Sequence, residues 1–269
     1  MLQDLKLSII TVVRNGANSI EGTIKSILAQ TYKNIEYIII DGKSTDGTLA
    51  IIEQYQHQLA YWVSEPDRGI YDAMNKGIRV ATGDWLLFIN SDDFLTENTI
   101  IQQVVPYLIN CESEVAYGKV EFIYSSGKEV SYGLDWKIIK DKFINISMRI
   151  PHQATFHSKA LFIKEQYDIS YKVLGDYDLL LGYLKTQDAI FIPLTIAKMY
   201  EGGISNQISK YTLLKETRKA QIKHKIYKYI PSIEWFAYGA KLILVNAVIR
   251  IFGTVGKDKI KYIKKYISF

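Results

Sequence analysis

Apolar, strand-like runs alternate with helical patterns over residues 1–90, and this alternation constrains the fold more than any other feature of the chain. Continuous apolar runs rich in branched side chains are typical of strands buried on both faces of a sheet. They lie at Leu7–Val13, Ile35–Ile40, Leu59–Val63 and Trp85–Ile89. Between them, apolar residues recur at helical spacing from Ile20 to Leu28, from Leu49 to Tyr55 and over Ile70–Val80. This order predicts an α/β fold whose mostly parallel, twisted sheet is flanked by helices on both faces.

The alternation becomes less regular after Asp93. A helix is predicted over Ile100–Leu108. A hairpin follows, because the turn-forming run Ser125-Ser126-Gly127 separates the strand-like segments Val115–Tyr124 and Lys128–Tyr132. The remaining predicted elements are short helices over Ala160–Gln166 and Asp176–Leu184, and short strands over Ile190–Ile192 and Ile196–Tyr200.

Polar clusters follow the predicted strands at the points where they end. They are Arg14-Asn15, Asp41 to Thr48, Glu65 to Gly69, and Asn90 to Asp93. Ligands of open α/β sheets bind beyond the carboxyl ends of the strands, so these clusters indicate a ligand site on one rim. A simpler interpretation also exists for some of them, since Asp46 can cap the next helix while Gly42 and Gly47 make turns.

The motifs at the strand ends exclude two common nucleotide sites and favour a metal. No G-x-G-x-x-G follows a strand and no G-x-x-x-x-G-K-[ST] occurs in the chain. Asp92 and Asp93 suit a hard divalent cation, Mg²⁺ or Mn²⁺, which takes oxygen ligands and neutralises a diphosphate leaving group. If the backbone is extended there, the two side chains diverge, and only one of them binds the metal.

These motifs resemble those of the family 2 glycosyltransferases, which have the GT-A fold, over roughly residues 5–204. The family's opening strand S-I-I-x-P-x-Y-N corresponds to Ser8 to Asn15, with Val12 and Arg14 in place of Pro and Tyr. Its motif D-[DG]-x-S-x-D-[GN]-T is intact from Asp41 to Thr48. The segment Ser64 to Gly77 is similar to a subgroup of bacterial cell-surface polysaccharide enzymes. The metal motif D-x-D-D reads Asn90 to Asp93, so an amide replaces the first carboxylate.

The resemblance implies roles for individual residues. Asp41 would hydrogen-bond the nucleotide base with Asn15 near it, and Asn90 would contact the ribose. Asp92 would coordinate the metal, and Asp176, in Gly175-Asp176-Tyr177-Asp178, would be the general base. Other expected nucleotide-sugar contacts are Thr11, Val13, Ser44, Asp46, Arg68, Asn75 and Ser91; expected sugar or acceptor contacts are Asp93, His152 and Gln153. Asn90 carries no charge, whereas the family has a carboxylate at this position. The affinity of the site for a metal ion is the property that this replacement affects.

Several of these residues also have plain structural interpretations. His152, one of 4 histidines, can be a buried structural group, and Asp176 can be a helix N-cap. Arg68 can be an ordinary surface charge or a phosphate contact. Glu201 to Ser205 can be a plain loop, whereas in the family a Gly-Gly-x-Ser segment often closes over the nucleotide.

The resemblance also implies an organisation and an activity. Residues 1–204 would form the catalytic domain, with a nucleotide-binding half at 1–93 and an acceptor-binding half at 94–204. We expect inverting, non-processive transfer of one sugar from a UDP-sugar, with Mn²⁺ or Mg²⁺, to a glycan or lipid-linked acceptor in surface-polysaccharide synthesis. The chain lacks the Q-x-x-R-W segment of processive synthases. The alternatives are a sugar-1-phosphate nucleotidyltransferase, whose Gly-rich loop is absent, and a degenerate transferase-like binding protein, which Asn90 motivates.

Residues 205–269 form a basic, helical extension in this interpretation. They hold 14 Lys+Arg against 3 Asp+Glu, a balance of +11, and the other residues hold 19 against 25, which gives the net +5. The run Trp235–Phe252 is interrupted by Lys241, Asn246 and Arg250, so it predicts an in-plane amphipathic helix instead of a bilayer span. Lys257–Lys265 would add attraction to anionic lipid. The alternative is a pair of helices packed on the catalytic domain.

The expected location is the cytoplasm, peripherally on the inner face of the cell membrane. Met1 to Val13 predicts a first strand and no signal peptide, and the single cysteine, Cys111, fits a reducing compartment. Nucleic acid is not an expected partner, because no recognised binding module accompanies the basic charge.

Overall fold

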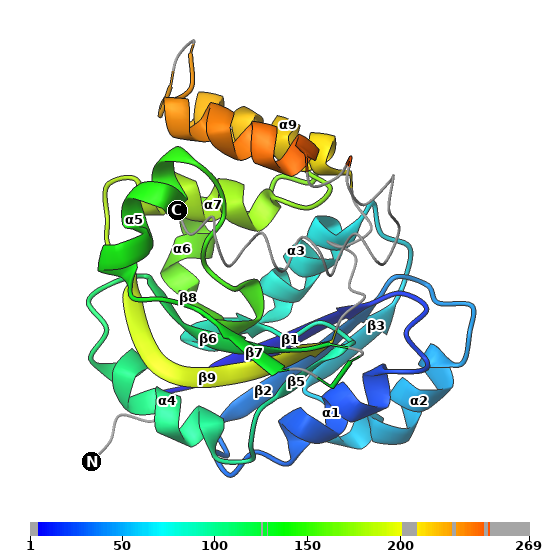
Figure 1. Cartoon of the computed structure of the whole chain (residues 1–269). Helices are drawn as coiled ribbons and strands as arrows, with labels where there is room; N and C mark the ends of the chain where they lie inside the picture. The colour runs from blue at the N-terminus through cyan, green and yellow to red at the C-terminus, as the bar shows by residue number, and fades with distance from the viewer. Residues whose placement is uncertain are drawn as a thin grey trace.

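One twisted sheet organises the chain in the computed structural model, which describes residues 5–124, 126–127, 129–200, 209–227, 230–244 and 247 (Figure 1). Eight of its 9 strands follow the order β3-β2-β1-β4-β8-β6-β9-β5, and the ninth, β7, pairs with β6 outside this path. The strands in chain order are β1 (Leu7–Val13), β2 (Ile35–Asp41), β3 (Tyr61–Ser64), β4 (Trp85–Phe88), β5 (Asp93–Leu95), β6 (Val115–Ile123), β7 (Glu129–Tyr132), β8 (Thr155–Ser158) and β9 (Ile190–Tyr200).

The first half of the sheet is parallel, as the sequence predicts. β1 pairs in parallel with both β2 and β4, and β2 pairs in parallel with β3. Asp41 aligns with Val13 on one side and with Ser64 on the other, so these strands end together. Their carboxyl ends therefore form one rim, which is where the polar clusters of the sequence lie.

The second half of the sheet is mixed. β8 runs antiparallel to both β4 and β6, whereas β9 runs parallel to β6 and antiparallel to β5. The predicted hairpin is confirmed, because β6 and β7 pair antiparallel. The prediction of two strands at Ile190–Ile192 and Ile196–Tyr200 is wrong, since β9 is continuous. Pro193 lacks an amide donor, and the register against β6 shifts opposite it, between Tyr117 and Lys119, which lets the strand continue.

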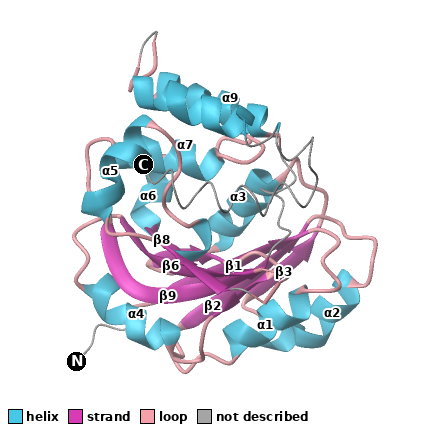
Figure 2. Ribbon diagram, in the orientation of Figure 1, coloured by secondary structure: helices cyan, strands magenta, loops and turns pink. Residues whose placement is uncertain are grey.

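Helices cover both faces of the sheet (Figure 2). On one face lie α1 (Ile20–Leu28), α2 (Thr48–Tyr55) and α4 (Ile100–Ile109). On the other lie α3 (Ile70–Val80), α5 (Trp136–Asn145), α6 (Lys159–Lys164) and α7 (Gly175–Leu184), with α9 (Lys210–Lys223) outside them. Short 3₁₀ turns, η1 (Gln56–Gln58) and η2 (His152–Ala154), complete the described elements.

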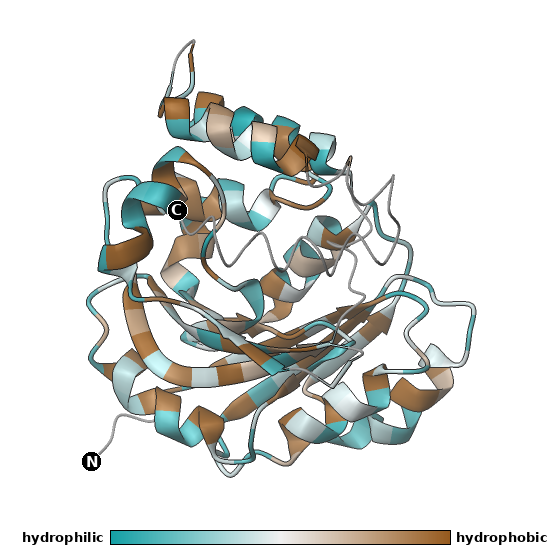
Figure 3. Ribbon diagram, in the orientation of Figure 1, coloured by the Kyte–Doolittle hydropathy of each residue, from teal (hydrophilic) through white to brown (hydrophobic). Residues whose placement is uncertain are grey.

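Each face has its own hydrophobic core, because successive side chains of a strand point to opposite faces. Along β1, Ile9 packs into the core under α1, whereas Ile10 and Val12 pack into the core under α3 and α7. All 7 residues of β1 are buried, and its two polar residues, Ser8 and Thr11, have hydrogen-bonding partners inside the protein. Figure 3 shows hydrophobic residues along the strands of the sheet between the two helical layers.

The C-terminal region begins, within the described residues, with α9. This helix packs against α7, and its residues Thr217, Ala220 and Gln221 are only 0–2% exposed. A second helical stretch covers 233–244. The expected domain boundary after residue 204, the segment Glu201 to Ser205 and the Lys257–Lys265 cluster lie outside the described residues. Among the helices that are described, none is both long enough and apolar enough to cross a membrane.

Candidate active site

The loops after β1 and β2 hold Asp41 and Asn15 next to each other on the rim. The Asp41 carboxylate is fully buried and accepts hydrogen bonds from the amide and hydroxyl of Ser44, the amide at 3.0 Å, and from Ser64 Oγ at 2.5 Å. Asn15 has a φ of 54°, a left-handed conformation that Asn tolerates better than most residues. Its amide donates to Ser44 Oγ at 2.7 Å, and its Oδ1 accepts from the Thr45 amide at 2.9 Å. Ser44 therefore joins the two loops.

Two expected nucleotide contacts on this rim have internal partners. Asp46 is exposed, but its carboxylate accepts from the amides of Thr48 at 3.0 Å and Ala17 at 3.1 Å. The N-cap of α2 is nevertheless Gly47, so Asp46 is not the N-cap, although it accepts from the amide of the first helical residue. The side chain of Thr11 is directed away from the rim, because it is fully buried and its hydroxyl lies 3.1 Å from the hydroxyl of Tyr37. Val13 is buried in the core beside α1.

Arg68 and Asn75, near the start of α3, also have intramolecular partners. The Arg68 guanidinium is 74% exposed and pairs with Asp72 at 3.2 Å. Asn75 is 5% exposed, and its side-chain amide donates to the Tyr167 carbonyl at 2.8 Å and accepts from the Tyr167 amide at 3.0 Å. Both polar atoms of Asn75 thus hold the backbone of Tyr167, and its contact with the nucleotide stays a prediction.

The segment Asn90 to Asp93 is a tight turn. The amide of Asp93 donates to the carbonyl of Asn90 at 3.1 Å, so the backbone there is not extended. The turn leads directly into β5 and places Asp93 inside the protein, 3% exposed, whereas Asp92 and Ser91 stay half-buried. Burial and the neighbouring Asp92 raise the pKa of Asp93 to about 8, against the opposing effect of hydrogen bonds from Gln153 and Asn90.

This turn offers oxygen atoms that fit a hard divalent cation. Asn90 Oδ1 and Asp93 Oδ2 are buried, and neither has a hydrogen-bond partner among the described residues. Buried polar atoms are normally paired, so two unpaired oxygens beside the half-buried Asp92 indicate a missing ligand. No group of three His, Cys, Asp or Glu side chains that could hold a metal occurs in the described part of the chain. A cation here would need further oxygens from a bound diphosphate.

Asp176 lies at the start of α7, close to this turn in space. Its Oδ1 accepts from the amide of Tyr177 at 2.8 Å and lies 3.4 Å from the hydroxyl of Tyr71. The N-cap of α7 is Leu174, so Asp176 is not the N-cap. Gly175 allows this approach, because a Cβ there would lie 2.8 Å from the Tyr71 ring. Burial raises the pKa of Asp176, although His152 opposes that shift.

The short turn η2 links Asp176 with the acidic turn. His152 Nδ1 lies 3.6 Å from Asp176 Oδ2, and the imidazole stacks on Phe88, with 5.5 Å between ring centroids. Burial lowers the pKa of His152. The next residue, Gln153, is 9% exposed and hydrogen-bonds Asp93. The structure therefore brings together Asp92, Asp93, His152, Gln153 and Asp176, which we call the rim site.

The rim site also contains two tyrosines that were not predicted from the sequence. Tyr71 donates to the carbonyl of Val173 and is also 3.4 Å from Asp176. Tyr167 is 3% exposed, packs 5.4 Å from the Tyr71 ring, and its hydroxyl has no partner among the described residues. Burial and the nearby Asp176 raise the pKa of both, so both remain hydrogen-bond donors. Tyr71 lies within the family-like segment Ser64 to Gly77, but no motif marks Tyr167.

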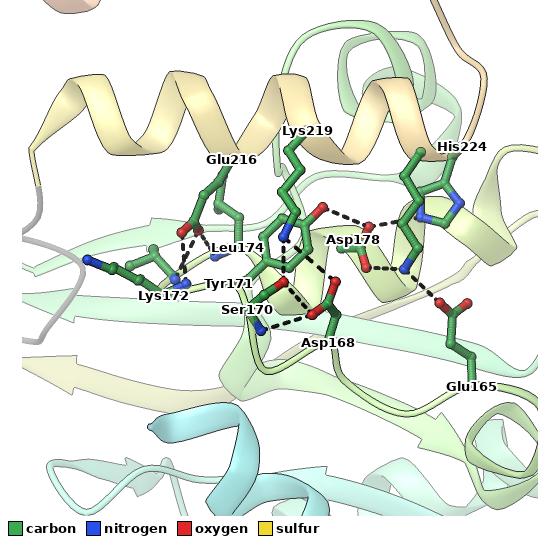
Figure 4. A network of polar contacts seen from close by, with 12 residues as sticks. Glu165, Asp168, Ser170, Tyr171, Lys172, Leu174, Asp178, Glu216, Lys219 and His224 are labelled. Carbon is green, nitrogen blue, oxygen red and sulfur yellow. Dashed lines mark hydrogen bonds and ion pairs between the residues drawn. The ribbon is translucent and has the colours of Figure 1, made fainter. Parts of the chain in front are cut away.

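Asp178, two residues after Asp176, has a different environment. It is 1% exposed and contacts the Tyr171 hydroxyl at 3.1 Å, Lys223 Nζ at 2.7 Å and His224 Nε2 at 3.0 Å (Figure 4). It therefore joins α7 to α9 and does not face the rim site, as helical geometry predicts for residues two apart.

Comparison with known proteins gives a consistent result. The family model described as glycosyl transferase family 2 matches residues 8–168. A PGL/p-HBAD biosynthesis glycosyltransferase of Mycobacterium bovis is 32% identical over 217 residues, which are 77% of this chain and 82% of the relative.

Solved structures agree on the fold. S. aureus TarS 1-349 in complex with UDP matches 93% of this chain and 73% of its own, with a TM-score of 0.64 and 16% identity. The mannosyltransferase PcManGT of Pyrobaculum calidifontis, solved with GDP-Man and Mn²⁺, matches 96% of this chain and 79% of its own. Its TM-score is 0.64 and its sequence identity is 14%. The predicted GT-A-like fold is thus confirmed.

Proposed function

The chain belongs to glycosyl transferase family 2 and is a glycosyltransferase, and from this premise we propose that it moves one sugar from a UDP-sugar to an acceptor hydroxyl with inversion. The observation that carries the proposal is the position of Asp176. It is a buried carboxylate at the start of α7, and η2 connects it to the acidic turn of Asn90 to Asp93. A buried carboxylate with a raised pKa, next to a turn that we propose binds the diphosphate, suits the activation of an acceptor hydroxyl.

In this proposal Asp176 takes the proton of the acceptor hydroxyl. The oxygen then attacks the anomeric carbon as the bond from that carbon to the diphosphate breaks on the opposite side. One base suffices for inversion, and a second carboxylate for a covalent intermediate is not needed. The Tyr71 hydroxyl lies 3.4 Å from Asp176 Oδ1 and His152 Nδ1 lies 3.6 Å from Oδ2, so these two neighbours limit the positions that the Asp176 carboxylate can take.

We assign the metal site to Asp92, with Asn90 beside it. The unpaired Oδ1 of Asn90 supports this assignment, and the solved neighbour PcManGT, whose structure contains Mn²⁺, supports a divalent metal. Mn²⁺ or Mg²⁺, when bound there, supplies charge neutralisation to the departing diphosphate. Asp93 is too deeply buried to share the exposed side of the turn, and its proposed role is to orient Gln153 and through it the sugar.

The donor is proposed to be a UDP-sugar bound along the parallel half of the sheet. One end of this surface is formed by Asp41, Asn15 and Ser44, which would contact the base. Ser91 and Arg68 would contact the rest of the nucleotide. The TarS complex with UDP supports a uridine nucleotide, whereas PcManGT was solved with GDP-Man. In this scheme residues 1–93 bind the nucleotide and residues 94–204 bind the acceptor.

The acceptor is proposed to be a lipid-linked glycan of surface-polysaccharide synthesis, reached at the inner face of the cell membrane. The relative that acts in PGL/p-HBAD biosynthesis supports a glycolipid product. Large apolar side chains of the C-terminal region are 52–83% exposed at Ile230, Ile233, Phe236, Ile243 and Leu244, as expected for a helix that lies in a lipid interface. The part of residues 205–269 that follows α9 would thus be directed to the membrane.

A donor panel tests this function. The protein is incubated with UDP- and GDP-sugars, Mn²⁺ and a lipid-linked glycan acceptor extract, and the anomeric configuration of the product is read by NMR. The proposal expects a UDP-sugar to be consumed and the product to have the anomeric configuration opposite to that of the donor. Retention of configuration, or turnover of GDP-sugars alone, would contradict it.

A further inference from the structure

Glu216 of α9 caps the chain segment that leads into the helix of Asp176. Its carboxylate is 7% exposed and accepts from three successive amides, those of Lys172 at 2.8 Å, Val173 at 3.1 Å and Leu174 at 3.0 Å (Figure 4). α7 begins at the next residue, and its N-cap is Leu174, whose apolar side chain cannot accept a hydrogen bond. Glu216 therefore supplies, from another helix, the acceptor and the negative charge that a helix N-terminus favours.

The segment held by Glu216 is also the one that orients Asp176. The Tyr71 hydroxyl donates to the Val173 carbonyl and lies 3.4 Å from Asp176 Oδ1. The backbone of Val173 is therefore held at both of its polar groups. Its amide donates to Glu216, and its carbonyl accepts from Tyr71. A shift of this segment would move Tyr71 and Asp176 relative to His152.

We propose that Glu216 is a positioning residue for the general base, which makes α9 a working part of the catalytic unit although it lies beyond the matched family region at 8–168. The inference rests on the proposed role of Asp176. Other contacts keep α9 docked independently of Glu216: Lys223 with Asp178 and Glu165, and Lys219 with Asp168 and Ser170. The loss of Glu216 should therefore disturb the 172–174 segment more than the attachment of the helix.

Kinetics of Glu216→Ala and Glu216→Gln test the proposal in the full-length enzyme. The alanine variant should lose about 10- to 100-fold in kcat, the cost of a small misplacement of a catalytic group. The glutamine variant should lose less, because its amide oxygen can still accept from this segment. UDP affinity and the KM for the donor should stay near wild type in both. Glu234→Gln, at an exposed carboxylate of the next helical stretch, is the matched control and should keep full kcat.

A double-mutant comparison separates positioning from folding. In an Asp176→Asn background, Glu216→Ala should cause little further loss of kcat, since its effect acts through Asp176. If both Glu216 variants bind UDP normally and keep wild-type kcat while Asp176→Asn is impaired, the positioning role is wrong and the proposed function stands. If Asp176→Asn itself keeps wild-type transfer, the base assignment fails first. If the alanine variant does not fold, the glutamine variant decides by the same criterion.

Discussion

Asp92 and Asp93 are adjacent in sequence but occupy opposite environments. The turn at Asn90 to Asp93 leaves Asp92 half-buried at the surface and puts Asp93 inside, where burial raises its pKa to about 8. A charged carboxylate is costly to bury, whereas at the surface it can bind a cation. Burial therefore gives Asp92 and Asp93 different roles. Asp92 is therefore the residue whose removal should matter most for the metal.

The first prediction concerns this metal. Asp92→Ala should lower transfer by on the order of 100-fold or more, because the charge developing on the diphosphate then lacks its counter-ion. Transfer should also stop in excess chelator and return with Mn²⁺ or Mg²⁺. Asn90→Asp should keep the metal requirement and tighten metal binding, measured by calorimetry in the presence of UDP. Glu53→Ala, at an exposed carboxylate of α2, is the control; full wild-type activity in chelator would refute the assignment.

Motifs predicted which residues gather at the rim but not what each side chain does there. Asp41, Asn15, Asp92, His152 and Asp176 were predicted from their sequence neighbours, and the structure places them along the rim or next to it. Asn75 belongs to an equally clear motif, yet both its polar atoms bind the backbone of Tyr167, which is 92 residues away. Such a partner is set by the tertiary fold and leaves no local signal.

At the scale of elements, the contact between α7 and α9 is electrostatic at its centre. Asp178 is buried in α7, and hydrogen bonds from Lys223 and His224 of the α9 region reach it at 2.7 and 3.0 Å. Burial raises the pKa of Asp178, but the hydrogen bonds from His224 and Lys223 outweigh it and leave the pKa below its usual 3.8. The contact is therefore strongest when Asp178 is ionised.

The second prediction follows from this lowered pKa. A carboxylate with a lowered folded-state pKa stabilises the protein above its unfolded pKa, and the stabilisation is lost as pH falls through the folded value. Asp178→Asn should thus lower the free energy of unfolding by about 1–3 kcal/mol at pH 7, the range for hydrogen bonds to charged groups. The difference from wild type should shrink below pH 4, measured by urea unfolding across pH.

A surface pair provides the control for this element. Glu21→Gln breaks an ion pair with Lys25 in which both side chains are about half exposed, at 47% and 62%. Exposed pairs contribute little, so this variant should unfold at nearly the same urea concentration as wild type. A loss for Asp178→Asn that stays constant from pH 7 to pH 3 would show that the charge of Asp178 does not hold α9.

Which elements could be predicted depended on their length and periodicity. β1, β2, α1 and α3 lie within a residue of their predicted limits, because each has a largely apolar run or a clear helical spacing. The 3 residues of β5 and the 4 of β8 are too few to show a period, so their pairing depends on neighbours distant in sequence. α5 was missed as well, since its Trp136, Ile139 and Phe143 stripe lies among exposed polar residues.

At the scale of the whole molecule, charge and exposed apolar surface coincide in the C-terminal region. Residues 205–269 carry the +11 balance, and the described part includes exposed Ile233 and Phe236 at 83% and 52%. α9 contacts the segment before α7 through Glu216, and it contacts Asp178 of α7 through Lys223. The stretch from 231 onward follows α9. A deletion beginning there removes the proposed membrane contact and leaves the rim site intact.

The third prediction concerns this surface. The intact protein should sediment with anionic vesicles at low salt and should be released as ionic strength rises, because exposed charges are screened. Deletion of residues 231–269 should weaken sedimentation while UDP affinity is retained. Neutral vesicles serve as the control. An intact protein that ignores anionic vesicles would show that these helices serve structure or oligomerisation instead.

The proposed mechanism depends on Asp176 as the base. The pH dependence of transfer should therefore follow the titration of the Asp176 carboxyl. Because burial raises the pKa of Asp176 above 3.8, the acid limb of kcat in the wild-type enzyme should lie above that pH. Below the limb Asp176 is protonated and cannot accept the acceptor's proton. An acid limb at or below 3.8 would mean that a less buried carboxylate controls the reaction.

The most direct measurement is the transfer rate of Asp176→Asn, taken beside its affinity for UDP. Asparagine is nearly isosteric and keeps the contact to the Tyr177 amide, but it cannot take a proton. Transfer should fall by about 10²–10⁴-fold, the contribution of a general base, while UDP binding stays close to wild type. Wild-type transfer by Asp176→Asn would contradict the account, because the base would then lie elsewhere.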